Sequence, residues 1–97
     1  MKSTADEIQA LEMYELAVAL VKTNGVSLTL GVIPFKEYRT GSVTIHYLPR
    51  SGHLDVWDGR KVLTVDRWKG PPQVVRYVPG YWEDELATAA AKSLSKA

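Results

Sequence analysis

SVTIHYLPRSGHLDVWDGRKVLTVDR, residues 42–67, contains three segments in which apolar and polar residues alternate. Alternation with a period of two is typical of strands that bury one face. Two turn sequences separate the segments. Pro49-Arg50-Ser51-Gly52 favours a four-residue loop, and Asp58-Gly59 favours a two-residue hairpin turn. This part of the chain therefore predicts three antiparallel strands joined by two hairpins.

The two turns predict which residues lie opposite one another. In the first hairpin, Leu48 pairs with His53 and His46 pairs with Asp55, and in the second hairpin Trp57 pairs with Arg60. Both registers give the same two faces. The expected core face consists of Val43, Ile45, Tyr47, Leu54, Val56, Leu63 and Val65. The expected open, polar face consists of Thr44, His46, His53, Asp55, Trp57, Arg60, Val62, Thr64 and Asp66.

Segments on either side extend this sheet. Residues 26–32 alternate and predict a further strand, and residues 74–78 predict a short one. Residues 33–39 contain Pro34 and mixed charge, and we interpret them as a connection.

Helices are predicted at both ends of the chain. Thr4-Ala5-Asp6-Glu7 is a capping box, and Asn24-Gly25 predicts a left-handed cap, so the first helix covers about residues 5–23. From Tyr81 the pattern is helical again, with acidic residues in the first turn and Trp82 as the main apolar side chain. We expect an α+β fold in the order α-β-β-β-β-β-α. Both helices pack on one face of an antiparallel sheet of four or five strands.

The composition limits the class of protein. The 97 residues are 45% hydrophobic and 24% charged, which is typical of folded domains, so we expect one domain over residues 1–97. The absence of cysteine excludes disulfides and thiolate chemistry. The sequence shows no signal-peptide pattern, and its longest apolar stretch, residues 16–21, is far below the roughly 20 residues of a membrane span. We therefore expect a cytoplasmic protein without membrane contact.

Two histidines and a carboxylate are the chemistry-bearing residues of the expected open face. His46, His53 and Asp55 could together bind a divalent metal or act as a histidine-carboxylate dyad. Solvated strand residues forming an ordinary cross-strand pair are the simpler interpretation. The chain has no phosphate loop, nucleophile elbow, HExxH or EF-hand motif. We predict no catalytic residue and no cofactor, and we do not expect an enzyme.

Basic residues are concentrated in the middle of the chain. Residues 36–76 carry eight basic and four acidic residues, a net charge of +4. A basic sheet with aromatic residues is typical of some nucleic-acid-binding domains, although their pI is commonly above about 9 and this chain has a pI near 8.0. Trp57 and Arg60 equally fit a cation-π pair that stabilises their hairpin. The candidate binding residues are Trp57, Arg60, Arg67, Lys69 and Arg76.

The first predicted helix is apolar over more than half of its circumference. A helix on one sheet needs an apolar stripe of only a little over about 100°. This excess predicts a non-catalytic protein-interaction module that self-associates, as a homodimer or other homo-oligomer, through its first helix. Nucleic-acid binding by the basic, aromatic sheet face is the alternative. Neither the process nor the partner is indicated by a motif.

Overall fold

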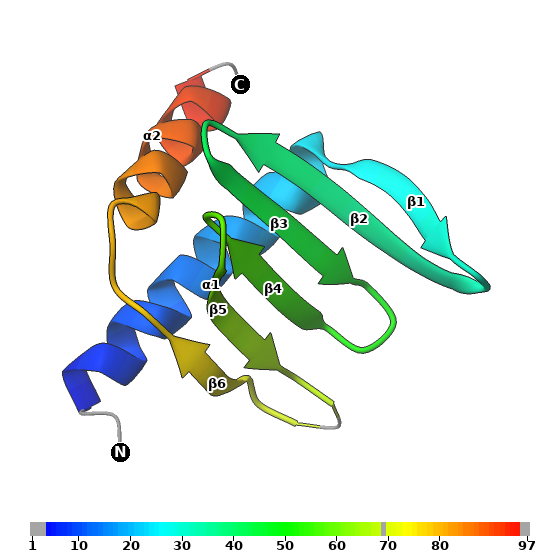
Figure 1. Ribbon diagram of the computed structural model, residues 1–97, viewed down its shortest axis with the longest axis horizontal. Helices are drawn as coiled ribbons and strands as arrows, with labels where there is room; N and C mark the ends of the chain where they lie inside the picture. The colour runs from blue at the N-terminus through cyan, green and yellow to red at the C-terminus, as the bar shows by residue number, and fades with distance from the viewer. Residues whose placement is uncertain (1–3, 69, 96–97) are drawn as a thin grey trace.

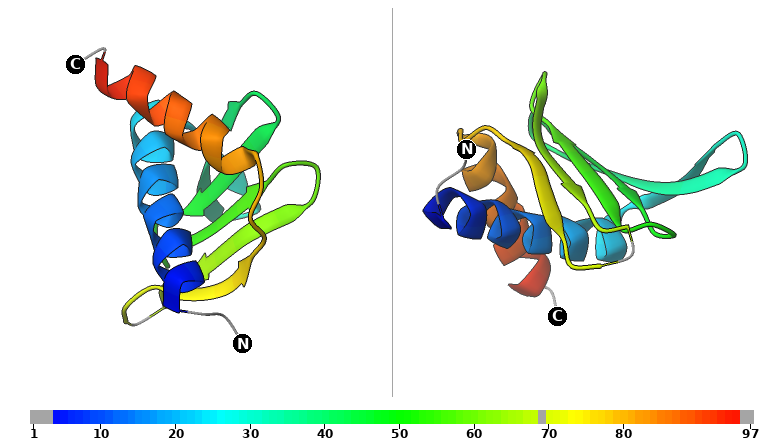
Figure 2. Two further views of the ribbon diagram at one scale, coloured as in Figure 1. Left: turned by 90° about the vertical axis from the view of Figure 1, so that its left-hand side faces the viewer. Right: turned by 90° about the horizontal axis from the view of Figure 1, so that it is seen from below.

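The computed structural model describes residues 4–68 and 70–95, and it contains an antiparallel sheet with both helices on one face (Figures 1 and 2). Helix α1 spans Thr4–Asn24 and helix α2 spans Trp82–Ser95. The strands follow one another across the sheet in chain order. They are β1 (Val26–Leu30), β2 (Ile33–Thr40), β3 (Val43–Leu48), β4 (His53–Trp57), β5 (Lys61–Asp66) and β6 (Gln73–Tyr77). The predicted α+β class is confirmed, with six strands instead of four or five.

The additional strand is β2, which we interpreted as a connection. Pro34 was the reason for that interpretation, because proline is rare inside sheets. Pro34 pairs with Thr29 of β1, whereas the pairing of β2 with β3 begins only at Lys36. At Pro34, β2 therefore pairs with β1 only. On the side of β3 there is no hydrogen-bond ladder at this position for the missing N–H of proline to interrupt.

The register of the first predicted hairpin is confirmed, and that of the second is wrong. Strands β3 and β4 pair His46 with Asp55, as expected. In the second hairpin Trp57 lies opposite Lys61, not Arg60, and a bulge follows between β4 and β5. Beyond the bulge the register differs from the prediction by two residues, which preserves the faces. Val62 is the exception, because it is 1% exposed and belongs to the core.

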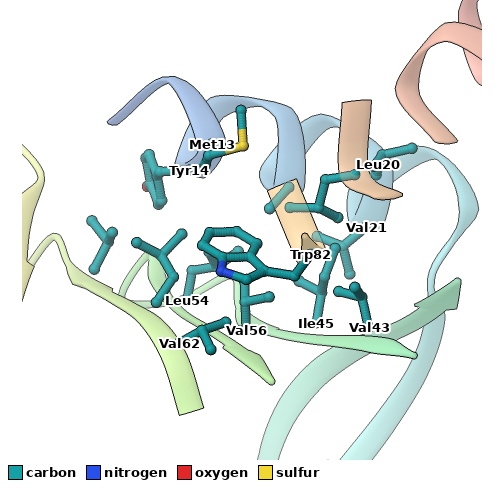
Figure 3. Packing of buried hydrophobic residues seen from close by; sticks show 14 of the residues in the cluster. Met13, Tyr14, Leu20, Val21, Val43, Ile45, Leu54, Val56, Val62 and Trp82 are labelled. Carbon is teal, nitrogen blue, oxygen red and sulfur yellow. The ribbon is translucent and has the colours of Figure 1, made fainter. Parts of the chain in front are cut away.

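The core fills the space between the helices and the sheet (Figure 3). Trp82 extends from α2 into its centre, and its Nε1 donates a hydrogen bond of 2.7 Å to the carbonyl oxygen of Val78. Every residue of the predicted core face is buried. Helix α1 contributes Ala10, Met13, Tyr14, Ala17, Leu20 and Val21, and α2 contributes Trp82, Leu86, Ala89 and Ala90.

The junction between α1 and β1 is a close contact. The amide of Gly25 donates to the carbonyl oxygen of Val21 at 2.8 Å, and a Cβ at Gly25 would collide with that oxygen. Gly25 is not among the glycines with positive φ, so the predicted left-handed cap is wrong. Glycine is needed at this position for space and not for a left-handed backbone.

Strands β1 and β2 extend beyond the rest of the sheet and away from the helices (Figures 1 and 2). Residues 28–35 form a two-stranded ribbon, because β2 pairs with β3 only from Lys36 onward. We call residues 28–35 the arm. Its turn is Gly31-Val32, with Gly31 at a φ of 64°, a positive value of the kind that the first position of a two-residue hairpin turn requires.

Candidate binding surface

The sheet face opposite the helices, the open face, carries the polar residues predicted for it. The register places His46 opposite Asp55, and Trp57 opposite Thr44. Tyr47 and Leu54, which alternate with these residues, are buried on the helix side. The prediction that His46, His53, Asp55 and Trp57 share the face away from the helices is therefore confirmed.

An aromatic row crosses three strands of the open face. The ring centroid of Phe35 in β2 is 5.2 Å from that of His46 in β3, and His46 is 4.8 Å from Trp57 in β4. The His46 and Trp57 rings meet edge to face, an arrangement favoured between aromatic side chains. Lys61 Nζ lies 5.3 Å from the centre of the Trp57 ring. The cation-π partner of Trp57 is thus Lys61, whereas the sequence predicted Arg60.

Asp55 is the centre of a polar network of side chains from β4 and β5. Thr64 Oγ1 donates to Asp55 Oδ1 at 2.7 Å, and His53 Nε2 lies 3.0 Å from Asp55 Oδ2. Lys61 Nζ is 3.7 Å from Asp55 Oδ1. The Asp55 side chain is only 13% exposed, and both of its oxygens have partners. This arrangement stabilises the sheet and leaves little of the carboxylate for a ligand.

Glu37 is the carboxylate that the sequence analysis missed. It lies directly opposite His46, and His46 Nε2 is 2.7 Å from Glu37 Oε2. This hydrogen bond holds the pKa of Glu37 below its ordinary value, and Arg39, 3.5 Å away, acts in the same direction against the opposing effect of burial. Glu37 was missed because residues 33–39 were interpreted as a connection, not as a strand.

The proposed metal ligands form two separate pairs. His46 contacts Glu37, and His53 contacts Asp55. Within residues 4–68 and 70–95, no group of three or more histidine, aspartate or glutamate side chains is arranged to hold a metal ion. The geometry therefore gives the metal hypothesis no ligand set: His46 and Glu37 form a cross-strand pair between β3 and β2, and His53 and Asp55 interact along β4.

The predicted basic binding residues do not form one patch. Trp57 lies on the open face, and Arg60 lies in the β4–β5 turn. Arg76 pairs with Thr64 at the β6 edge. Arg67 lies near Gly52 and Tyr47, toward the helix side, and Lys69 lies outside the described residues.

Acidic side chains also interrupt the open face. Glu37, Asp55 and Asp66 each lie within 4 Å of a histidine nitrogen. A phosphate backbone approaching the aromatic row would meet these carboxylates, and like charges repel. The open face therefore has mixed charge, and the basic surplus of residues 36–76 is spread over both sides of the sheet and its turns.

Exposed apolar side chains are concentrated on β1 and the arm. Val26, Leu28 and Leu30 point to the same face of β1 and are 62%, 39% and 73% exposed. Val32 and Ile33 in the turn and at the start of β2 are also exposed. All five residues of β1 are exposed, so the predicted strand is confirmed but its expected buried face is not. Alternation indicated the strand and could not indicate that neither helix covers it.

The apolar surface of α1 is largely covered within the chain. The sheet and α2 bury one side of it, and Leu16 and Val18 pack against the same core. Gln9 Nε2 donates to Glu83 Oε1 at 2.8 Å, and Asn24 Nδ2 donates to Ser93 Oγ at 3.3 Å, so the two helices are joined along their length. The observation that motivated self-association through the first helix is thus accounted for by α2.

A polar hollow of about 370 Å³ lies between α2, the end of α1 and the β2–β3 turn. Its carboxylate, Glu85, already binds the turn: its two oxygens accept from the amide of Ser42 at 3.0 Å and the hydroxyl of Ser42 at 2.7 Å. These bonds hold the pKa of Glu85 below its ordinary value. The Glu85 carboxylate therefore serves to attach α2 to the β2–β3 turn.

No helix among the described residues is long and apolar enough to cross a membrane.

Comparisons with known proteins identify no relative of this chain. No protein-family model matches the chain, and neither the curated proteins nor the solved structures contain a significant match to it.

Proposed function

We propose that this chain is a non-catalytic protein-interaction module that self-associates, and that β1 and the arm carry the contact. The proposal keeps the self-association expected from the sequence and moves it from the first helix to the sheet edge. The observation that carries it is the exposure of Val26, Leu28 and Leu30 on one face of an uncharged edge strand.

The physical argument concerns both the side chains and the backbone of β1. Burying apolar surface contributes roughly 25 cal/mol per Å². As the first strand of the sheet, β1 is bonded on one side only, and its other side offers backbone donors and acceptors to a further strand. A partner that covers this edge therefore gains hydrogen bonds and apolar burial together.

Sedimentation velocity over roughly 10 to 500 µM tests the proposal, because micromolar dissociation constants change the oligomer fraction in this range. We expect a concentration-dependent dimer. Leu28→Lys should weaken it at least about tenfold, since it places charge at the contact. The matched control is Val75→Lys, which changes an exposed residue of β6 at the opposite edge and should leave the dimer intact. A monomer at every concentration would refute the proposal.

Nucleic-acid binding is the second candidate, and the aromatic row of Phe35, His46 and Trp57 favours it, because stacked bases bind such side chains. The acidic residues of the open face argue against it. Binding of short labelled RNA and DNA at two salt concentrations tests this candidate. Affinity that falls steeply with salt and is lost in Trp57→Ala would support it, and no binding at low salt would exclude it.

A further inference from the structure

The arm is a two-stranded ribbon, and no third strand among the described residues pairs with it. Leu28 pairs with Phe35, Thr29 with Pro34 and Leu30 with Ile33, and β3 pairs with β2 only from Lys36 onward. A two-stranded ribbon is marginally stable in water, and a third strand or a packed face stabilises it. The missing strand can be added only along the outer edge of β1 or along the unpaired side of the arm residues in β2.

The outer edge of β1 is open to pairing with another strand. Natural edge strands are protected by charged residues, prolines or bulges. Strand β1 reads Val26-Ser27-Leu28-Thr29-Leu30, without charge or proline, and its register with β2 is regular. None of these protective devices is present in β1.

The sequence of β1 is complementary to itself when it is paired antiparallel. With Leu28 opposite Leu28 of a second copy, Val26 lies opposite Leu30, and Ser27 lies opposite Thr29. Residues directly opposite in an antiparallel pair point to the same side of the sheet. This register therefore places apolar side chains against apolar ones and hydroxyls against hydroxyls. A shift of one residue would set leucines against serine and threonine.

We infer that the partner of β1 is β1 of a second copy of this chain, paired antiparallel about a two-fold axis at Leu28. This inference rests on the proposed self-association and specifies its geometry. The pairing joins the two six-stranded sheets into one and gives each arm a third strand, residues 26–28 of β1 in the second copy. The interface is isologous, as in most homodimers. The axis is normal to the sheet, so both open faces lie on the same side.

Disulfide cross-linking tests this register directly, because the chain contains no cysteine. Directly opposite strand residues have Cβ atoms about 4.5 to 5.5 Å apart, close to the distance that a disulfide spans. We expect Leu28→Cys to form a covalent dimer under mild oxidation. Val26→Cys alone and Leu30→Cys alone should not, because each residue lies about 13 Å from its own counterpart. A mixture of Val26→Cys and Leu30→Cys should cross-link.

Val75→Cys, on the exposed β6 edge, is the control for collisional cross-linking. Far-UV circular dichroism and sedimentation under reducing conditions show that each variant is folded and self-associates. If reduced variants dimerise but Leu28→Cys cross-links no better than Val75→Cys, the β1 pairing is wrong while self-association stands. Cross-linking of Leu28→Cys without cross-linking of the mixture would overturn the antiparallel register. A strict monomer would overturn both the inference and the proposed function.

Discussion

Strands β1 and β6 are the two edges of one sheet and contain five residues each, but their surroundings differ. Strand β6 carries Arg76, and its register with β5 is interrupted by a bulge. Its end is attached to α2, because Tyr77 Oη donates to Glu83 Oε1 at 2.8 Å. Burial and Glu83 raise the pKa of Tyr77, which keeps the phenol protonated as a donor. Strand β1 has no charge, no bulge and no comparable attachment along its exposed residues.

This difference indicates different roles for the two edges. Charge and a bulge discourage a further strand from pairing with β6. Val74 and Tyr77 of this strand pack against the core, and Tyr77 joins its end to α2. The edge of β1 combines free backbone groups with apolar side chains. We therefore expect substitutions of the buried residues that join α2 to the end of β6 to change the stability of the monomer, and substitutions of the exposed apolar residues of β1 to change association.

Trp82→Ala should have the largest effect on stability. Trp82 is buried at the centre of the core and bonds the carbonyl of Val78 just beyond β6, so its truncation should cost about 3 to 5 kcal/mol. Urea denaturation of the monomer measures the loss. Tyr81→Ala, which truncates an adjacent side chain that is 74% exposed, should cost less than about 0.5 kcal/mol. Equal losses in both variants would contradict this description of the core.

Gly25→Ala should have an intermediate effect, because the new methyl group would press on the Val21 carbonyl where α1 enters β1. We expect a loss of about 1 to 3 kcal/mol, typical of overpacking. Gly70→Ala is the matched control, since a Cβ there meets no atom within 4 Å. It should be neutral or stabilising by up to about 1 kcal/mol. A tolerated Gly25→Ala would show that the start of β1 is less constrained than its contacts indicate.

Glu37→Gln should have the smallest effect and one that depends on pH. His46 lowers the pKa of Glu37 in the folded state below the ordinary value of 4.5. The resulting stability is present above pH 4.5 and is lost as the pH falls through the lower folded value. The variant should be less stable at pH 7 by about 0.5 to 1 kcal/mol, and the difference should shrink toward pH 3. Thermal denaturation across this range measures it, with Glu12→Gln on exposed helix surface as the control.

The sequence predicts the fold best where turn chemistry and alternation agree. The loop Pro49-Arg50-Ser51-Gly52 fixed the β3–β4 register, and the faces of His46 and Asp55 followed from it. The β4–β5 register was wrong for two reasons. Arg60 belongs to the turn, so Trp57 lies opposite Lys61, and a bulge then adds one more residue to β5, which the short-range turn signal of Asp58-Gly59 does not reveal. Strand β2 was missed because the effect of Pro34 depends on how far β3 extends, which is a property of the assembled sheet.

The candidate surface was less predictable, because exposure depends on which strand lies at the edge. Alternation over residues 26–30 indicates a strand with one apolar face, and the same pattern describes a buried strand and an uncovered one. The apolar excess of α1 was a local observation whose explanation, the packing of α2, is a long-range contact. Sequence periodicity carries no information about such contacts.

Hydrogen exchange of the unmodified protein at low and high concentration, roughly 10 and 500 µM, tests most directly whether a second copy covers the β1 edge. Amides that gain a partner exchange more slowly. We predict that exchange in residues 26–30 slows with increasing concentration, whereas exchange in residues 73–77 of β6 does not change. Concentration-independent exchange in β1 together with a dimer in sedimentation, or slowing at β6 instead of β1, would contradict the account.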